Sequence, residues 1–142
     1  MNYLKNYFSN KNTAFYIAVA VAAASVVVGI AYACSWIKEY ESVASLVLLI
    51  VGAIGFFVLS VINPNIGAAF NSGCSLLAFA LYTGKTFSYI TTNFATGVDF
   101  KDSTVIKIIL FAVLMFALFV ASNVFVYVNM KKNNPTEENR DE

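Results

Sequence analysis

Four stretches of the sequence contain no charged side chain: residues 14–37, 43–62, 66–84 and 108–129. A helix needs about 20 residues to cross a hydrocarbon core about 30 Å thick, and each stretch is close to that length. The pattern therefore predicts an all-α membrane protein with four transmembrane helices. Because these helices use most of the chain, we expect one transmembrane domain over residues 14–130.

Local chemistry refines the expected helix ends. Thr13 and Ser42 are candidate caps for the first and second helices, since a hydroxyl oxygen accepts hydrogen bonds from the free N–H groups of a first turn. Only Asn63-Pro64-Asn65 separates the second and third stretches, which requires a tight hairpin of neighbouring helices. The expected helices cover residues 14–37, 43–62, 66–84 and 105–130.

The connection after the third stretch has apolar residues at positions 87, 90 and 94, with polar residues between them. Spacings of three and four are typical of one helix face, so the third helix is expected either to continue, as far as residue 95, or to lie along the membrane surface. Gly97 is the expected helix stop, and Asp102 or Ser103 the expected start of the fourth helix.

The third stretch is the least apolar of the four. It carries Asn71, Ser72, Ser75 and Thr83, and alone it would insert only weakly into a bilayer. The tight hairpin favours its crossing, which gives an up-down-up-down four-helix bundle with both termini on one side. The alternative is a re-entrant third segment.

Composition agrees with a membrane protein. The chain is 59% hydrophobic and 12% charged, whereas soluble domains are about 45–50% apolar and about 25% charged. A net charge of +1, without a basic patch, gives no reason to expect a nucleic-acid partner. The expected surroundings are the lipid bilayer and a membrane-protein partner or further copies of the chain.

The lysines outside the helices predict the orientation. Lys5 and Lys11 precede the first helix without an acidic residue, whereas Lys38 alone follows it, and cytoplasmic segments carry the excess of basic residues. Both termini are therefore expected in the cytoplasm. Residues 1–13 are expected to form either an interfacial N-terminal segment or a disordered polar segment, and residues 131–142 a disordered tail. The richness in asparagine and lysine points by association to a bacterial inner (plasma) membrane.

The sequence offers little for catalysis. It has no histidine, and all eight acidic residues fall outside the charge-free stretches. A hydrolase, a metalloenzyme or a proton-coupled carrier would need such groups within reach of its substrate. We therefore expect no enzyme activity, catalytic residue, cofactor or metal. Cys34 and Cys74 are expected to be small packing residues, because the topology separates them.

A series of small residues follows one face of the first helix. The residues after Ala14 recur at intervals of three or four, which lets another helix approach closely. The face packs either within the chain's own bundle or against another chain. This candidate packing face consists of Ala18, Ala22, Ser25, Gly29 and Ala33.

A second series, mostly polar, follows one face of the third helix. Such a face should avoid lipid, so it either forms hydrogen bonds between helices or contacts a solute, an ion or a partner's polar helix. Ala78 and Tyr89 lie on the same face. The candidate contact residues are Asn71, Ser75, Tyr82 and Lys85, joined at the hairpin end by Ser60 and Asn63.

These features favour a small polytopic protein without its own catalysis, acting as a structural, accessory or regulatory subunit of a transporter or other membrane complex. The alternative is a small homo-oligomeric channel or facilitator for a neutral solute, in which the polar faces of two copies line one path.

Overall fold

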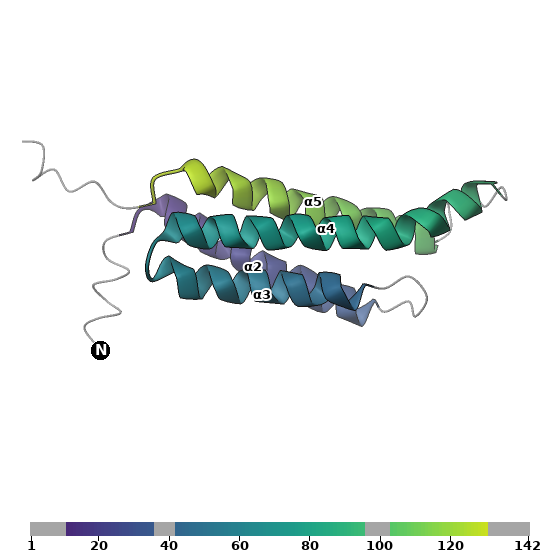
Figure 1. Cartoon of the computed structure of the whole chain (residues 1–142), viewed down its shortest axis with the longest axis horizontal. Helices are drawn as coiled ribbons and strands as arrows, with labels where there is room; N and C mark the ends of the chain where they lie inside the picture. The colour runs from purple at the N-terminus through teal and green to yellow at the C-terminus, as the bar shows by residue number, and fades with distance from the viewer. Residues whose placement is uncertain (1–10, 36–41, 96–102, 131–142) are drawn as a thin grey trace, which may run out of the picture.

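A computed structural model describes residues 11–35, 42–95 and 103–130, and within these ranges the protein is helical apart from short connections and ends. Figure 1 shows the helices lying side by side along one long axis. They are α2 (Thr13–Cys34), α3 (Val43–Ser60), α4 (Pro64–Ala95) and α5 (Ser103–Tyr127).

All four helices are long and apolar enough to cross a membrane. The prediction of an all-α chain with four membrane-length helices is therefore confirmed. As expected, α4 is the least apolar. It is also one uninterrupted helix of 32 residues, so the chain reversal that a re-entrant segment requires is absent from residues 64–95.

The helix ends follow local hydrogen-bonding chemistry, with one correction. The predicted cap at Ser42 is confirmed, because its Oγ accepts a hydrogen bond from the Ser45 amide at 3.2 Å. The predicted cap at Thr13 is wrong. Asn12 caps α2 instead, its Oδ1 accepting from the Phe15 amide at 3.3 Å, since a short carboxamide reaches the first turn as well as a hydroxyl does.

The hairpin between α3 and α4 is tighter than predicted, because Pro64 is already the first residue of α4. Proline suits this position, since its φ is fixed near the helical value and its missing N–H would have no partner there. Asn63 Oδ1 accepts a hydrogen bond from the Asn65 amide at 3.0 Å. The Cβ of any other residue at Gly67 would lie 2.7 Å from the Phe56 carbonyl oxygen, so this close turn requires glycine.

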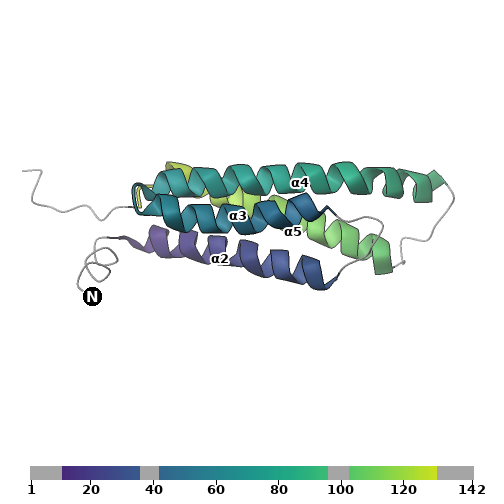
Figure 2. The same ribbon diagram turned by 60° about the horizontal axis from the view of Figure 1, so that its bottom comes forward.

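The four helices surround a shared core. α4 packs against α3 and α5, and α2 packs against the same two helices from the other side. Figures 1 and 2 show the start of α2, the α3–α4 turn and the end of α5 at one end of the molecule, called here the terminal end. The opposite end, where α2 ends and α5 begins, is called the distal end.

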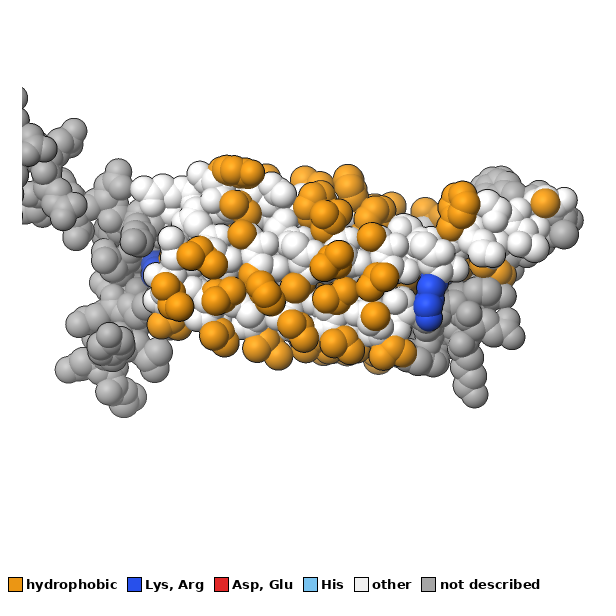
Figure 3. Space-filling view, viewed as in Figure 1, with side chains coloured by type: hydrophobic (Ala, Val, Ile, Leu, Met, Phe, Trp, Pro, Cys, Tyr) orange, Lys and Arg blue, Asp and Glu red, His pale blue; other side chains and the backbone are white. Residues whose placement is uncertain are grey.

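Apolar side chains also cover the outside. Figure 3 shows hydrophobic atoms spread over the middle of the visible face, with lysine atoms at its two ends. Side chains as large as Phe57, Leu77 and Phe116 are exposed by about half. A chain that buries most of its described serines while exposing such residues is suited to a surrounding of lipid tails.

The last turns of α4 extend past the distal ends of α2 and α3 and depart from the direction of the rest of the helix (Figure 1). This agrees with the first of the two expectations for residues 85–95. Threonine hydroxyls that bond to the preceding turn bend a helix, and α4 has a series of them. The donors are Thr83, Thr86, Thr91 and Thr92, each to the carbonyl four residues before it.

The expected stop at Gly97, the start at Asp102, the N-terminal segment and the tail lie outside the described residues or mostly so. The two cysteines are not bonded to each other; Cys34 is exposed and Cys74 is buried.

Candidate functional site

Polar side chains are buried at several levels along the inside of the bundle, from Ser45 near the start of α3 to Ser60 at its end. Each member has at most 4% of its surface exposed. α4 contributes the largest share, on the face that the sequence singles out. We call this set the polar layer: Ser25, Ser45, Ser60, Asn71, Ser72, Ser75 and Ser122.

Asn71 is the central member of the polar layer. Its Nδ2 donates a hydrogen bond of 2.8 Å to Ser122 Oγ on α5. Its Oδ1 faces α3, because a Cβ built on Gly52 would lie 2.9 Å from this oxygen and 2.8 Å from the Cβ of Cys74. One carboxamide thus links α4 to α5 and fills the space that glycine leaves on α3.

A second, longer hydrogen bond joins the same two helices. Asn123 Nδ2 donates to Ser72 Oγ at 3.4 Å. Two such bonds in adjacent positions fix the alignment of α4 along α5, since sliding either helix would leave polar groups facing hydrocarbon.

Three oxygens in the polar layer are buried and have no hydrogen-bond partner among the described residues: Ser45 Oγ, Asn71 Oδ1 and Ser75 Oγ. They could bind a small neutral molecule. The interior next to Asn71 offers no such space, because the void between Ala18, Phe56 and Ser122 has no room for a water molecule.

The distal end of the bundle is closed by aromatic rings. The Tyr32 ring lies edge-on to the rings of Tyr82 and Phe111, with centroids 5.5 and 5.4 Å apart. The Tyr32 hydroxyl accepts from the Ser42 amide at 2.8 Å, and the Tyr82 hydroxyl donates to the Ile108 carbonyl at 3.3 Å. The Tyr32 hydroxyl therefore connects α2 to the start of α3, and the Tyr82 hydroxyl connects α4 to α5.

The terminal end is closed as well. Phe15 and Phe56 stack with their centroids 6.4 Å apart. Met130, just beyond α5, is fully buried in the same cluster. The polar layer is consequently shut off from both ends of the bundle.

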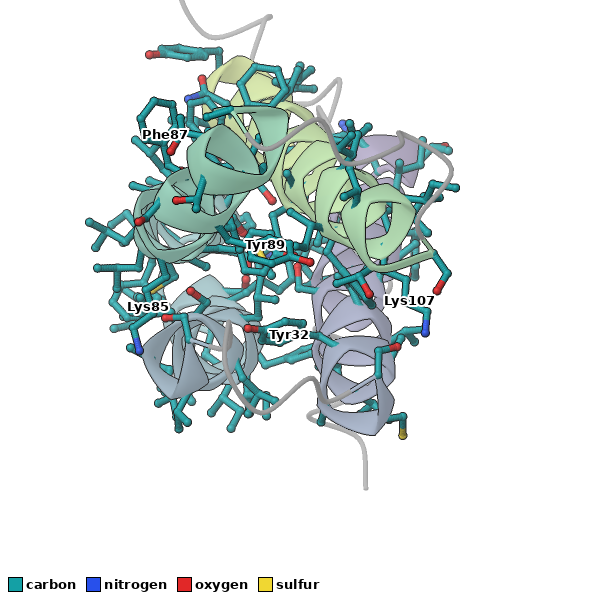
Figure 4. All side chains as sticks on the ribbon, turned by 90° about the vertical axis from the view of Figure 1, so that its right-hand side faces the viewer. Tyr32, Lys85, Phe87, Tyr89 and Lys107 are labelled. Carbon is teal, nitrogen blue, oxygen red and sulfur yellow. The ribbon has the colours of Figure 1, made fainter. Side chains whose placement is uncertain are left out.

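The residues predicted from the third helix divide into two groups. Asn71, Ser75 and Tyr82 are buried on one face of α4, Ser60 is buried beside the hairpin, and Asn63 is half-buried. Lys85 is exposed and does not join them. Figure 4 shows Lys85 and Lys107 pointing away on opposite sides of the distal end, with Tyr89 and Tyr32 over its middle.

Thr86 takes the buried position next after Tyr82 on α4, with 2% of its surface exposed. Its hydroxyl donates to the Tyr82 carbonyl at 2.9 Å. A threonine can satisfy its hydroxyl on its own helix, whereas a buried ammonium would need an anionic partner. This difference explains why Thr86 faces inward and its neighbour Lys85 faces outward.

The small residues of the first helix lie inside the bundle. Ala18, Ala22, Ser25 and Gly29 are buried, and Ala33 is half-buried. A Cβ on Gly29 would be 3.8 Å from Leu49 of α3, an ordinary contact distance. In this structure the face therefore packs against helices of its own chain.

A shallow groove crosses the outer face of α3 next to α4. It has a volume of about 330 Å³ and a wholly apolar lining. The Phe70 ring lies against Gly55, where any Cβ would overlap it. The other lining residues are Val51, Ile54, Val58 and Leu59.

Two asparagines that the sequence analysis did not single out join the terminal end. Asn65 Nδ2 donates to the carbonyls of Val126 and Val128 at 2.8 and 2.9 Å, beyond the last regular bonds of α5. Asn12 Nδ2 donates to the Asn129 carbonyl at 2.5 Å. In the sequence, the only indication of this role is that Asn65 lies at the turn between α3 and α4 and that Asn12 directly precedes α2.

Within the described ranges, no group of three or more histidine, cysteine or acidic residues could hold a metal ion. The geometry therefore defines a class, that of small chains with four membrane-length helices and a closed, uncharged polar interior. Comparisons with protein families, curated proteins and solved structures gave no match to this chain.

Proposed function

We propose that this protein crosses the plasma membrane of a bacterium four times in up-down-up-down order, with both termini in the cytoplasm. There it serves, without catalysis of its own, as a structural, accessory or regulatory subunit of a transporter or another membrane complex. The excess of lysine before the first helix supports the orientation.

The main observation in favour of the subunit role is that the polar layer is buried inside the bundle. Asn71 and Tyr82, the two groups best placed for a solute, each donate a hydrogen bond to α5. A transport path would need these groups to face an opening. What remains on the outside is an apolar surface and the overhanging turns of α4, and both suit contact with another membrane protein.

The last turns of α4, which extend past the distal ends of α2 and α3 and are called here the overhang, are not needed to form the bundle. A 32-residue helix is about 48 Å long at about 1.5 Å per residue, well beyond the hydrocarbon thickness of about 30 Å. Phe87 lies on the overhang with 68% of its surface exposed, and Figure 4 shows it pointing outward. An exposed aromatic ring on a rigid helix is a common anchor for a partner.

Affinity purification from native membranes in mild detergent tests this role. We expect a larger membrane protein to co-purify with the wild-type chain and to be lost with Phe87→Ala. Tyr127→Ala is the matched control, because Tyr127 is also an exposed aromatic residue, on α5. Recovery of the chain alone under every mild condition would contradict the proposal.

The channel remains the second candidate, because Asn71 Oδ1 and Ser75 Oγ are buried without partners among the described residues. Opening the bundle, or pairing two copies, would give these oxygens a solute to bind. The test is flux of small neutral solutes into proteoliposomes that contain the purified chain alone. Flux that Asn71→Leu and Tyr82→Phe abolish would replace the subunit role with the channel, whereas no flux supports the subunit role.

A further inference from the structure

The chain turns back toward the bundle directly after α5. Tyr127 is 85% exposed, and Val128 and Asn129 are exposed as well, whereas Met130 is fully buried. Figure 1 shows this part of the chain turning from the end of α5 toward the start of α2. We call Asn129 and Met130 the strap, because they join two helices at the terminal end and place one side chain inside it.

Two asparagines hold the two sides of this turn. Asn65 Nδ2 donates to the Val128 carbonyl at 2.9 Å, which fixes the end of α5 to the hairpin. Beyond that point, the Asn12 amide donates to the Met130 carbonyl at 3.3 Å, and Asn12 Nδ2 donates to the Asn129 carbonyl. The strap can therefore leave Asn12 while α5 stays anchored, with the hinge after Val128.

The Met130 side chain closes the interior at the terminal end. It packs in one cluster with Phe56 and Ala68. The same two residues line the void inside the bundle, together with Asn71 and Ser122. The residues that pack around Met130 are thus also walls of the void, so withdrawing this side chain would open the void toward the terminal end.

The interior has unsatisfied polar groups that water would reach. In the closed arrangement the void has no room for a water molecule. Asn71, which lines it, has its Oδ1 buried without a hydrogen-bond partner among the described residues, and so has Ser75 Oγ on the same face of α4. A buried oxygen without a partner gains a hydrogen bond when water enters. Entry of water therefore offsets part of the cost of exposing Met130.

The contacts of the strap can be broken without separating helices. The hydrogen bond from Asn12 to the Asn129 carbonyl is exposed, so water competes for both groups. Methionine is unbranched and flexible, which lets it enter or leave a packed cluster easily. The distal end differs, because rings from α2, α4 and α5 pack edge-on there and opening it would require whole helices to move apart.

We propose that the strap is a gate, whose release lets water and neutral hydrogen-bonding solutes of similar size enter at the terminal end and reach Asn71 and Ser122. The lining residues of the void in the described chain are uncharged, so the cost of desolvation excludes ions. An opening at one end gives access without a path across the bundle. The inference is independent of the subunit role, because it concerns one chain and needs no partner.

Alkylation of a buried cysteine tests the gate. Purified full-length protein carrying Cys34→Ser, Cys74→Ala and the reporter Ser122→Cys is treated in mild detergent with iodoacetamide, and the added mass is followed over time. This small neutral reagent reacts with the thiolate, which forms only where water reaches the sulfur. We expect slow labelling with the intact strap and at least about 10-fold faster labelling with Met130→Ala, because the burial of that side chain is lost.

Matched variants separate the gate from general loosening of the bundle. Asn12→Asp keeps a capping oxygen for α2 but loses the side-chain donor to the strap, so labelling should accelerate by about 2- to 10-fold. Met115→Ala removes an equally buried methionine from the apolar cluster that contains Tyr82 and should leave labelling unchanged. A reporter at Ser45→Cys, fully buried near the start of α3, should stay protected in every variant.

Unchanged slow labelling of position 122 in Met130→Ala would overturn the proposal. Equal acceleration by Met115→Ala, or equal rates at positions 45 and 122, would do the same, because the whole bundle would then be opening. If Met130→Ala does not fold, Asn12→Asp decides alone, and an unchanged rate there overturns the gate. Failure of these tests leaves the subunit role standing, since that role depends on co-purification of a partner.

Discussion

At the residue scale, the interior depends on one carboxamide and on the glycine that makes room for it. Asn71 contacts α5 through its nitrogen and faces α3 through its oxygen, where Gly52 has no side chain to obstruct it. Protein interiors are packed too densely to absorb an added methyl group without a shift. The Gly52 position is therefore sensitive to the addition of a single methyl group.

We expect Gly52→Ala to lower the free energy of unfolding by about 1–3 kcal/mol, because the new Cβ would lie 2.8 Å from Cys74 Cβ and 2.9 Å from Asn71 Oδ1. Gly73→Ala is the control on α4. A Cβ there meets nothing within 4 Å, so the higher helix propensity of alanine should stabilise by up to about 1 kcal/mol. Unfolding in mixed micelles measures both, and equal effects would contradict the packing described.

The hydrogen bond between Asn71 and Ser122 has a measurable coupling. A double-mutant cycle with Asn71→Ala and Ser122→Ala should give about 0.6 kcal/mol, the average found between membrane helices. The same cycle on Ser72 and Asn123, whose bond is longer at 3.4 Å, should give less. A coupling near zero for the first pair would show that the two side chains do not interact in the membrane.

The sequence predicted these residues unevenly. Asn71, Ser75 and Tyr82 could be placed on one face because polar residues avoid lipid and helical spacing is regular. The same spacing could not show whether Lys85 or Thr86 faces inward, because positions three and four residues after Tyr82 both lie near its face of the helix. The choice depends on the cost of burying a charged group. Asn12 and Asn65 could not be predicted at all, since their partners are backbone carbonyls more than 60 residues away in the chain.

At the scale of the elements, the charge-free stretches predicted all four helices, because segment length and apolar composition are properties of the sequence itself. The ends were less accurate. α3 ends at Ser60 and α4 begins at Pro64, where the prediction had 62 and 66, because a hydrophobic residue such as Ile62 fits a turn at the membrane surface as well as a helix. The extension of α4 was indicated only by the spacing of the apolar residues at positions 87, 90 and 94.

The overhang of α4 predicts a boundary between lipid and water along one helix. In a chain without native cysteines (Cys34→Ser, Cys74→Ala), Thr91→Cys should react with a membrane-impermeant maleimide applied outside intact cells, because it lies beyond the bundle. Ala80→Cys is the control. Ala80 is exposed in the structure but lies in the apolar part of α4, so lipid should shield it. Labelling at position 80 but not at 91 would place the membrane elsewhere on the helix.

At the scale of the whole molecule, the arrangement of the helices brings residues 12 and 130 into contact. Four helices account for this without a long loop, because an even number of them returns the chain to the end of the bundle at which it started. The sequence predicted that return from the count of helices. The direct pairing of the two ends needed the structure, since hydrogen bonds between distant backbone groups leave no pattern in the residues.

Both termini should lie in the cytoplasm. In the same cysteine-free chain, Glu138→Cys should react with the impermeant maleimide only after the membrane is permeabilised, opposite to Thr91→Cys. The reason is the lysine excess before the first helix. Labelling of position 138 in intact cells would reverse the orientation and place the lysine-rich end outside.

The pairing of Asn12 with the residues after α5 also sets an order of events during synthesis. The ribosome makes Asn12 more than a hundred residues before its partner carbonyls at positions 129 and 130 exist. Until the last helix emerges, the beginning of the first one lacks both these bonds and the cover that Met130 provides. A chain that stops at Tyr127 would thus retain all four helices but lack these bonds and this cover, so membrane proteases should cleave it more readily at the start of α2.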